Sequence, residues 1–222
     1  MTEVRMHEVA LVPERTLGSP ADGGPLHGRL TFGWDLLPAD HEGAPPEWRS
    51  YADATPGREF RRLLMVCSFR PETPTGRGTF RHASLGVALS TPDPGARPVA
   101  RLIDPGERTR PVAVSGTGLN LTVKAGVLDV GVTRAPGAEP TREEWIVRGH
   151  GASQPNPQWE FRQVKRFPLV GDHPVSALVE IVPDRVNTAE VLFAAELEHR
   201  NWGIRRYRAH LAPPPHTIML SE

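Results

Sequence analysis

The sequence of 222 residues has only one cysteine, Cys67, so it cannot form a disulfide within the chain. This excludes the disulfide-stapled class of small secreted domains and favours a reducing compartment. The amino terminus, Met-Thr-Glu-Val-Arg-Met-His-Glu, lacks the apolar run of a signal peptide. No stretch reaches the about 20 apolar residues that a membrane-spanning helix needs. We therefore expect a cytoplasmic protein with no membrane partner.

The chain also lacks an excess of charge of either sign, with 26 basic and 26 acidic residues. A domain that binds nucleic acid usually carries a basic face or stripe, so we expect no nucleic-acid partner. Lysine occurs only at positions 124 and 165, and all other basic residues are arginine. This preference is typical of a GC-rich bacterial genome.

Runs long enough for helices are scarce, because 24 prolines and 21 glycines recur along the chain as turn residues. Between them lie short runs rich in Val, Leu, Phe and Trp, a spacing typical of a sandwich or barrel. We predict an all-β fold, an antiparallel β-sandwich of about ten strands with helix below roughly 15% of the chain. We expect one domain over residues 1–222, the alternative being two small β domains that divide near 104–118.

Apolar residues that recur at every second position predict the individual strands. Residues 29–36 alternate in this way, as expected for a strand with one face in the core. Residues 62–69 are apolar on both faces, which indicates a central strand. Further strands are predicted at 80–89, 98–103, 111–115, 144–148, 159–167 and 175–182. The run 119–133 changes phase at Ala125-Gly126, which indicates a β-bulge or, as the alternative, two strands joined tightly at Lys124–Gly126.

The segment 187–211 is predicted to be a β-hairpin with Asn201-Trp202-Gly203 as its loop. In that register Glu198 lies opposite Arg206, Glu196 opposite Arg208, and Leu197 opposite Tyr207. This arrangement sorts charge pairs onto one face and apolar pairs onto the other, and such pairs fix the register of a hairpin. The alternative is a helix that begins with a capping box of Asn187 and Glu190.

Known catalytic signatures are missing from the sequence. It has no Gly-x-Ser-x-Gly elbow, no Walker-type loop and no Gly-x-Gly-x-x-Gly after a strand. Its nine histidines never form His-x-His or His-Glu-x-x-His, and one cysteine cannot make a sulfur-rich zinc site. We therefore expect no cofactor, no metal and no catalytic residue, and we favour a protein that is not an enzyme.

Two segments contain candidate binding residues. At the tip of the predicted hairpin, Arg200, Trp202 and Arg205 are not matched by a glutamate on the opposite strand, and tryptophan and arginine are enriched in protein interfaces. The segment 38–59 is long for a connection within a domain, and such loops are often functional. It could form one helical turn that begins at Pro46. Trp48 and Tyr51 would then be binding residues.

The same segment supports an alternative function. Its polar side chains could bind a metal or act as an acid/base pair in a hydrolase, with the two aromatics as a platform for a sugar ring: Asp40, His41, Glu42 and Asp53. His150, between two glycines and next to a serine, lacks a nearby carboxylate and is interpreted as part of an exposed turn. Cys67 is interpreted as a small core residue.

The sequence is therefore most consistent with a non-enzymatic β-sandwich that binds another protein, as an adaptor or as a subunit of an intracellular assembly. The alternatives are a metal-dependent or acid/base hydrolase that uses the 38–59 loop, and a carbohydrate- or small-ligand-binding module. The sequence does not determine the oligomeric state.

Overall fold

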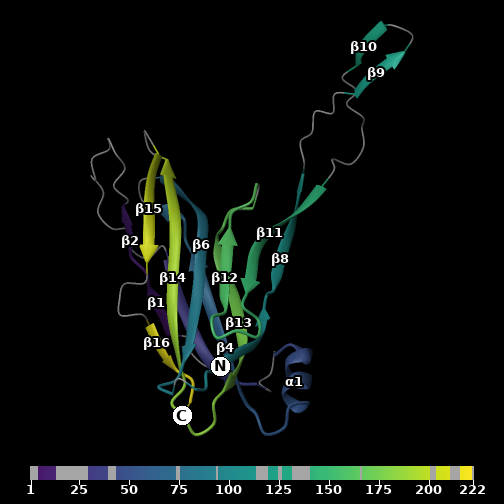
Figure 1. Ribbon diagram of the computed structural model, residues 1–222. Helices are drawn as coiled ribbons and strands as arrows, with labels where there is room; N and C mark the ends of the chain where they lie inside the picture. The colour runs from purple at the N-terminus through teal and green to yellow at the C-terminus, as the bar shows by residue number, and fades with distance from the viewer. Residues whose placement is uncertain are drawn as a thin grey trace.

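A computed structural model describes residues 5–13, 30–39, 44–73, 76–93, 95–113, 120–124, 127–131, 141–165, 167–200, 204–210 and 216–221. Within these residues the chain is nearly all β with one short helix, and its two main antiparallel sheets form a sandwich (Figure 1). The predicted all-β sandwich with little helix is therefore confirmed. The described residues form sixteen strands, more than the ten expected, because short edge strands add to the predicted ones.

The smaller sheet has five strands. In spatial order they are β1 (Arg5–Glu8), β3 (Leu30–Pro38), β4 (Glu59–Phe69), β13 (Gly171–Ile181) and β7 (Val99–Asp104). The strand predicted to be central is β4, which pairs with β3 on one side and β13 on the other. Its apolar composition on both faces is thus explained by its place in the middle of the sheet.

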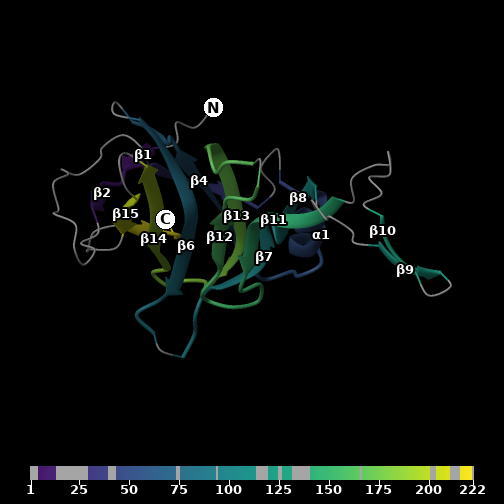
Figure 2. The same ribbon diagram turned by 90° about the horizontal axis from the view of Figure 1, so that it is seen from above.

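The larger sheet has nine strands. Its main path is β2 (Leu11–Pro13), β15 (Ile204–His210), β14 (Thr188–Arg200), β6 (Gly76–Ser90), β12 (Gln158–Arg162), β11 (Thr141–His150) and β8 (Glu107–Ala113). Two short strands lie off this path: β16 (His216–Met219) pairs with β14, and β5 (Glu72–Thr73) pairs with β6. Strands from both sides of residues 104–118 occur in each of the two sheets, which Figure 2 shows from above.

The predicted hairpin register at the carboxyl end is confirmed. In β14 and β15, Glu198 lies opposite Arg206, and Glu196 lies opposite Arg208. Leu197 lies opposite Tyr207, as expected. The segment is therefore a strand pair and not a helix. Its loop, 201–203, lies outside the described residues.

The long run at 119–133 forms two strands, β9 (Asn120–Lys124) and β10 (Val127–Gly131), which pair with each other as a separate sheet. The preferred interpretation of one bulged strand was wrong, and the alternative of two tightly joined strands is correct. Because Val127 lies opposite Lys124, two residues separate the strands, which is the commonest length of a hairpin loop.

The core fills the space between the two sheets. Inward residues of β4 and β13 meet inward residues of β6, β12 and β14, as their alternation of buried positions requires: Leu63, Met65, Cys67, Phe69, Leu85, Trp159, Phe161, Ala177, Val179 and Phe193. Cys67 is fully buried in this core, as predicted. Burial raises the pKa of its thiol above the ordinary value.

The helix α1 (Pro46–Asp53) covers part of the outer face of the smaller sheet (Figure 1). It begins at Pro46, as the sequence predicted, because proline suits the first turn of a helix. Leu178 on β13 points away from the core between the sheets, yet it is fully buried because Trp48 of α1 packs in the same cluster. The described part of the chain contains no helix that is long and apolar enough to cross a membrane.

Candidate functional site

The two aromatic residues predicted from the 38–59 segment attach α1 to the sheet. Trp48 is 2% exposed and clusters with Phe60 and Leu178. Tyr51 packs edge-on against Phe60, with ring centroids 5.8 Å apart. The guanidinium of Arg62 lies 5.7 Å from the centre of the Trp48 ring. These contacts give both side chains a structural role, while their part in ligand binding stays a prediction.

Arg62 is itself poorly solvated. Its Nε is buried without a hydrogen-bond partner among the described residues. Burial lowers the pKa of Arg62 below the ordinary value, although the charge of Asp104 opposes this shift. The Arg62 cation therefore lies between the indole of Trp48 and the attractive charge of Asp104.

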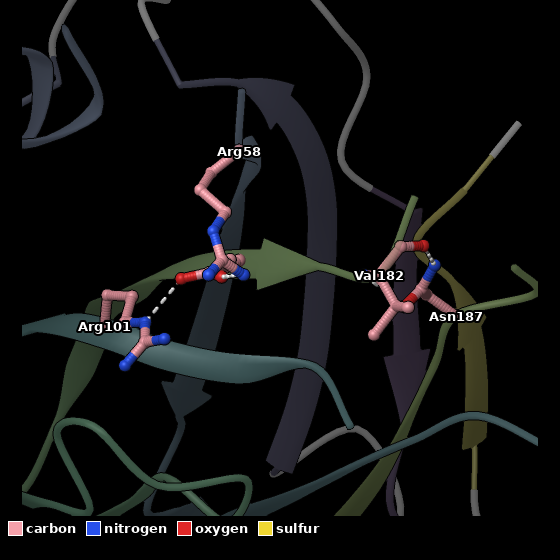
Figure 3. A network of polar contacts seen from close by, with 5 residues as sticks. Arg58, Arg101, Val182 and Asn187 are labelled. Atoms are coloured by element: carbon pink, nitrogen blue, oxygen red, sulfur yellow. Dashed lines mark hydrogen bonds and ion pairs between the residues drawn. The ribbon is translucent and has the colours of Figure 1, made fainter. Parts of the chain in front are cut away.

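A buried carboxylate on the smaller sheet holds the segment that connects α1 to β4. Glu180 on β13 is 8% exposed and accepts hydrogen bonds from two arginines (Figure 3). Nη1 of Arg58 lies 2.8 Å from one carboxylate oxygen, and Nε of Arg101 lies 2.6 Å from the other. The hydrogen bond to Glu180 raises the pKa of Arg101. This network links Arg58, the residue before β4, to β7 and β13 on the outer face.

Figure 3 also shows Asn187, a buried side chain that closes the turn between β13 and β14. Its Oδ1 accepts a hydrogen bond from the backbone N–H of Val182, and its Nδ2 donates to the carbonyl oxygens of Val182 and Arg185. This role differs from the helix cap that the sequence allowed. Side-chain hydrogen bonds of this kind are the reason that asparagine favours turns.

The outer face of the larger sheet holds a second arginine and tryptophan cluster. Trp145 on β11 is half-exposed, with the guanidinium of Arg162 4.1 Å and that of Arg148 4.9 Å from its ring centre. Arg148 also forms a 2.8 Å ion pair with Glu107, and Arg162 forms a 3.3 Å ion pair with Glu144. We call these five residues the tryptophan ladder.

The strand geometry explains why the tryptophan ladder faces outward. Val147 and Phe161 are buried in the core, so Arg148 and Arg162, their neighbours along β11 and β12, point to the opposite face. A register shift between Trp145 and Val147 then brings Trp145 onto the same side as the arginines. Nε of Arg162 also donates a 2.8 Å hydrogen bond to the backbone carbonyl of Trp145, which fixes the stack.

A shallow hollow lies on this same outer face, between β14, β6 and β12. It has a volume of about 270 Å³ and is lined by Ser84, Leu85, Gly86, Gln158, Leu192, Phe193 and Ala194. Leu192, on its β14 side, is 57% exposed. The outward side chains of Ser84 and Ala194 are small, so the floor of the hollow lies close to the backbone.

The remaining predicted site residues are not brought together by the described structure. Arg200 and Arg205 lie at the ends of β14 and β15, but their side chains and Trp202 lie outside the described residues. The same is true of the candidate polar residues 40–42. His150 is exposed at the end of β11. Within the described ranges, no group of three His, Cys, Asp or Glu side chains is placed to hold a metal ion.

Sequence reasoning missed the tryptophan ladder and the hollow. A partial signal existed, because the strand predicted at 144–148 contains Trp145 and Arg148. The rest of the cluster depends on which strands become neighbours, since Arg162 comes from β12 and Glu107 from β8. The local alternation of side chains does not determine which strands become neighbours in a sheet.

Comparisons with known proteins give little help. No protein-family model matches the sequence, and no curated protein matches it. Among solved structures, the chain is similar to the NetB toxin of Clostridium perfringens in its membrane-inserted form, with a TM-score of 0.34 and 8% identity over 97% of this chain and 94% of that chain. A likeness this weak carries no argument about fold or activity.

Proposed function

We propose that this chain is a non-enzymatic β-sandwich that binds another protein through the outer face of its larger sheet. The observation that carries the proposal is the tryptophan ladder, a half-exposed indole held between two arginines on a face that no described helix covers. Tryptophan and arginine are the residue types most enriched among the residues that dominate interface energies. The protein would act as an adaptor or as a subunit of an assembly.

Preorganisation supports this function. Long side chains normally lose about 0.5–1.5 kcal/mol each when a partner immobilises them. Here Glu107 and Glu144 already hold Arg148 and Arg162 against the indole, so less conformational freedom remains to be lost on binding. The arrangement presents an indole stacked against two guanidinium groups whose positions are already fixed.

The predicted hairpin tip belongs to the same proposal, because β14 and β15 are strands of the same sheet as the tryptophan ladder. Arg200, Trp202 and Arg205 would extend the contact surface at one end of that sheet. We place the protein in a reducing, cytoplasmic compartment, which is compatible with a lone buried thiol.

The test is affinity capture from the native host with three forms of the protein: wild type, Trp145→Ala with Arg162→Ala, and His150→Ala as a control on the same strand. A partner identified by mass spectrometry should then be purified and its Kd measured with each form. We expect the double variant to weaken binding at least tenfold with an unchanged fold, and His150→Ala to bind as wild type. Equal affinity of all three forms would show that the tryptophan ladder is not the contact surface.

A further inference from the structure

The hollow beside Gly86 has the size of a receptor for one side chain. Its volume of about 270 Å³ lies below the roughly 300–1,000 Å³ of pockets that bind small molecules. Its floor is made by Ser84, Gly86 and Ala194, and its β14 wall is the exposed side chain of Leu192. A bulky apolar group placed there would cover Leu192 and remove apolar surface from water.

The backbone conformation at Gly86 does not require a glycine, and the space above this residue is open. A Cβ built at this position meets no other atom within 4 Å, and Gly86 is not among the glycines with positive φ. An added Cβ would therefore meet neither a close contact nor an unfavourable φ at this position. Glycine here keeps the middle of the β14–β6–β12 face low.

Two carboxylates flank the hollow along one diagonal. Leu192, Gly86 and Gln158 form one row across three strands. Glu190 lies two residues before Leu192 on β14, and Glu160 lies two residues after Gln158 on β12. From the spacing of strands and residues, these two positions are about 17 Å apart, with the hollow between them.

The charges of these two carboxylates are not matched by ion pairs within the described part of the chain. Glu190 is exposed, and Glu160 is half-buried. Arg148 lies opposite Glu160 on β11, but its guanidinium is bound to Glu107 and stacked on Trp145. The diagonal thus combines an apolar centre with a negative charge at each end.

We propose that this hollow receives a single bulky apolar side chain from an extended segment of the partner protein, with lysine or arginine on either side of it. An extended chain advances about 3.3 Å per residue, so basic residues four or five positions apart reach both carboxylates. This inference rests on the proposed function and names the chemistry of its partner. Charge complementarity would also set the orientation of the bound segment.

The experiment uses a displayed library of random peptides selected on the wild-type protein. Enriched sequences are synthesised, and their Kd values are measured with Gly86→Trp, which fills the hollow, and with Leu192→Ser, which removes its apolar wall. Glu160→Lys with Glu190→Lys tests the two carboxylates. Glu143→Lys, an exposed position on β11, is the charge control. Thermal unfolding of each variant establishes that it is folded.

We expect enrichment of peptides with one large apolar residue between lysines or arginines. Their Kd should rise at least tenfold in Gly86→Trp, in Leu192→Ser and in the double charge variant, and should stay unchanged in Glu143→Lys. A selection without enrichment, acidic flanking residues, or undiminished binding to folded Gly86→Trp and Leu192→Ser would overturn the inference. If Trp145→Ala abolishes capture of the native partner while the hollow variants retain it, the proposed function stands and this inference fails.

Discussion

Two tryptophans in the described part of the chain, Trp48 and Trp145, carry an arginine on the face of their ring, yet their surroundings differ. Trp48 is buried between α1 and the smaller sheet, with Arg62 at 5.7 Å from its ring centre. Trp145 is half-exposed on the larger sheet, with Arg162 at 4.1 Å. The same pair of residue types therefore completes a core in one place and forms an exposed surface in the other. What decides between them is whether a helix covers the sheet.

The outward residues of each sheet reflect this difference. Under α1, the outer face carries the apolar side chains of Phe60, Leu178 and Leu102. On the larger sheet, the corresponding positions near the hollow are small or polar, as at Ser84 and Gln158. An outer face that no layer covers normally faces water, and its residues are chosen accordingly. The exposed Leu192 and the half-buried Trp145 are exceptions to this rule, which is why they are candidates for contact.

The largest expected effect is a difference in the free energy of unfolding between variants of Trp48 and Trp145. Trp48→Ala should lower the free energy of unfolding by about 3–5 kcal/mol, because it removes a buried aromatic and leaves a cavity beneath α1. Trp145→Ala should cost about 1 kcal/mol, since it loses mainly exposed cation–π contacts. Denaturant unfolding followed by tryptophan fluorescence and circular dichroism measures both. Similar losses for the two variants would show that Trp145 is also a core residue.

A second, smaller effect compares carboxylates on the two faces. Glu180→Ala should cost about 2 kcal/mol, because it removes two charge-assisted hydrogen bonds from a site that is nearly closed to solvent. Glu107→Ala should cost less than about 1 kcal/mol, as is usual for an exposed ion pair. Added salt should weaken the Glu107 contribution more than that of Glu180. If Glu107→Ala is the more damaging change, the tryptophan ladder has a structural role that exposure does not reveal.

Much of the fold could be predicted because the residues that determine each strand lie close together in the sequence. Alternation at 29–36 predicts β3, and the opposed charges of 187–211 predict the register of β14 and β15 residue by residue. In each case, the residues that form the pattern lie within one strand or on two strands joined by one short loop. The phase change at 119–133 was also visible, but the alternation alone did not distinguish a bulge from a turn.

The candidate surface could not be predicted, because its residues meet only through the order of strands. Arg162 reaches Trp145 since β12 pairs with β11, and Glu107 reaches Arg148 since β8 lies on the other side of β11. The register shift beside Trp145 also decides on which face the indole lies. In the same way, Trp48 could be recognised as aromatic in a loop, but its burial depends on where α1 packs.

A third tryptophan extends the comparison, because its neighbour is a histidine, whose charge depends on pH. Trp34 on β3 is half-buried, and its ring centre lies 6.1 Å from that of His216 on β16. The ring of His7 on β1 lies 4.2 Å from that of His216. Burial lowers the pKa of His216 below its ordinary value of 6.5, and the nearby charge of His7 lowers it further. Val191 on β14 lies opposite His216 in register, so His7 is the ionisable side chain among these three neighbours.

The smallest expected effect is therefore a loss of stability in acid that His216→Gln reduces. A base whose pKa is lower in the folded state binds more protons when unfolded. Its stabilising contribution is complete above pH 6.5 and is lost as the pH falls through the folded-state pKa of His216. Burial lowers the pKa of His173 too, so His216→Gln should remove only part of the slope. His7→Gln, made in the protein that keeps His216, should shift the loss of stability toward higher pH. The reason is that it removes the charge of His7, which lowers the pKa of His216. Urea unfolding at pH values from 5 to 8 measures these slopes, and identical curves for wild type and both variants would show that protonation of His216 is not coupled to folding.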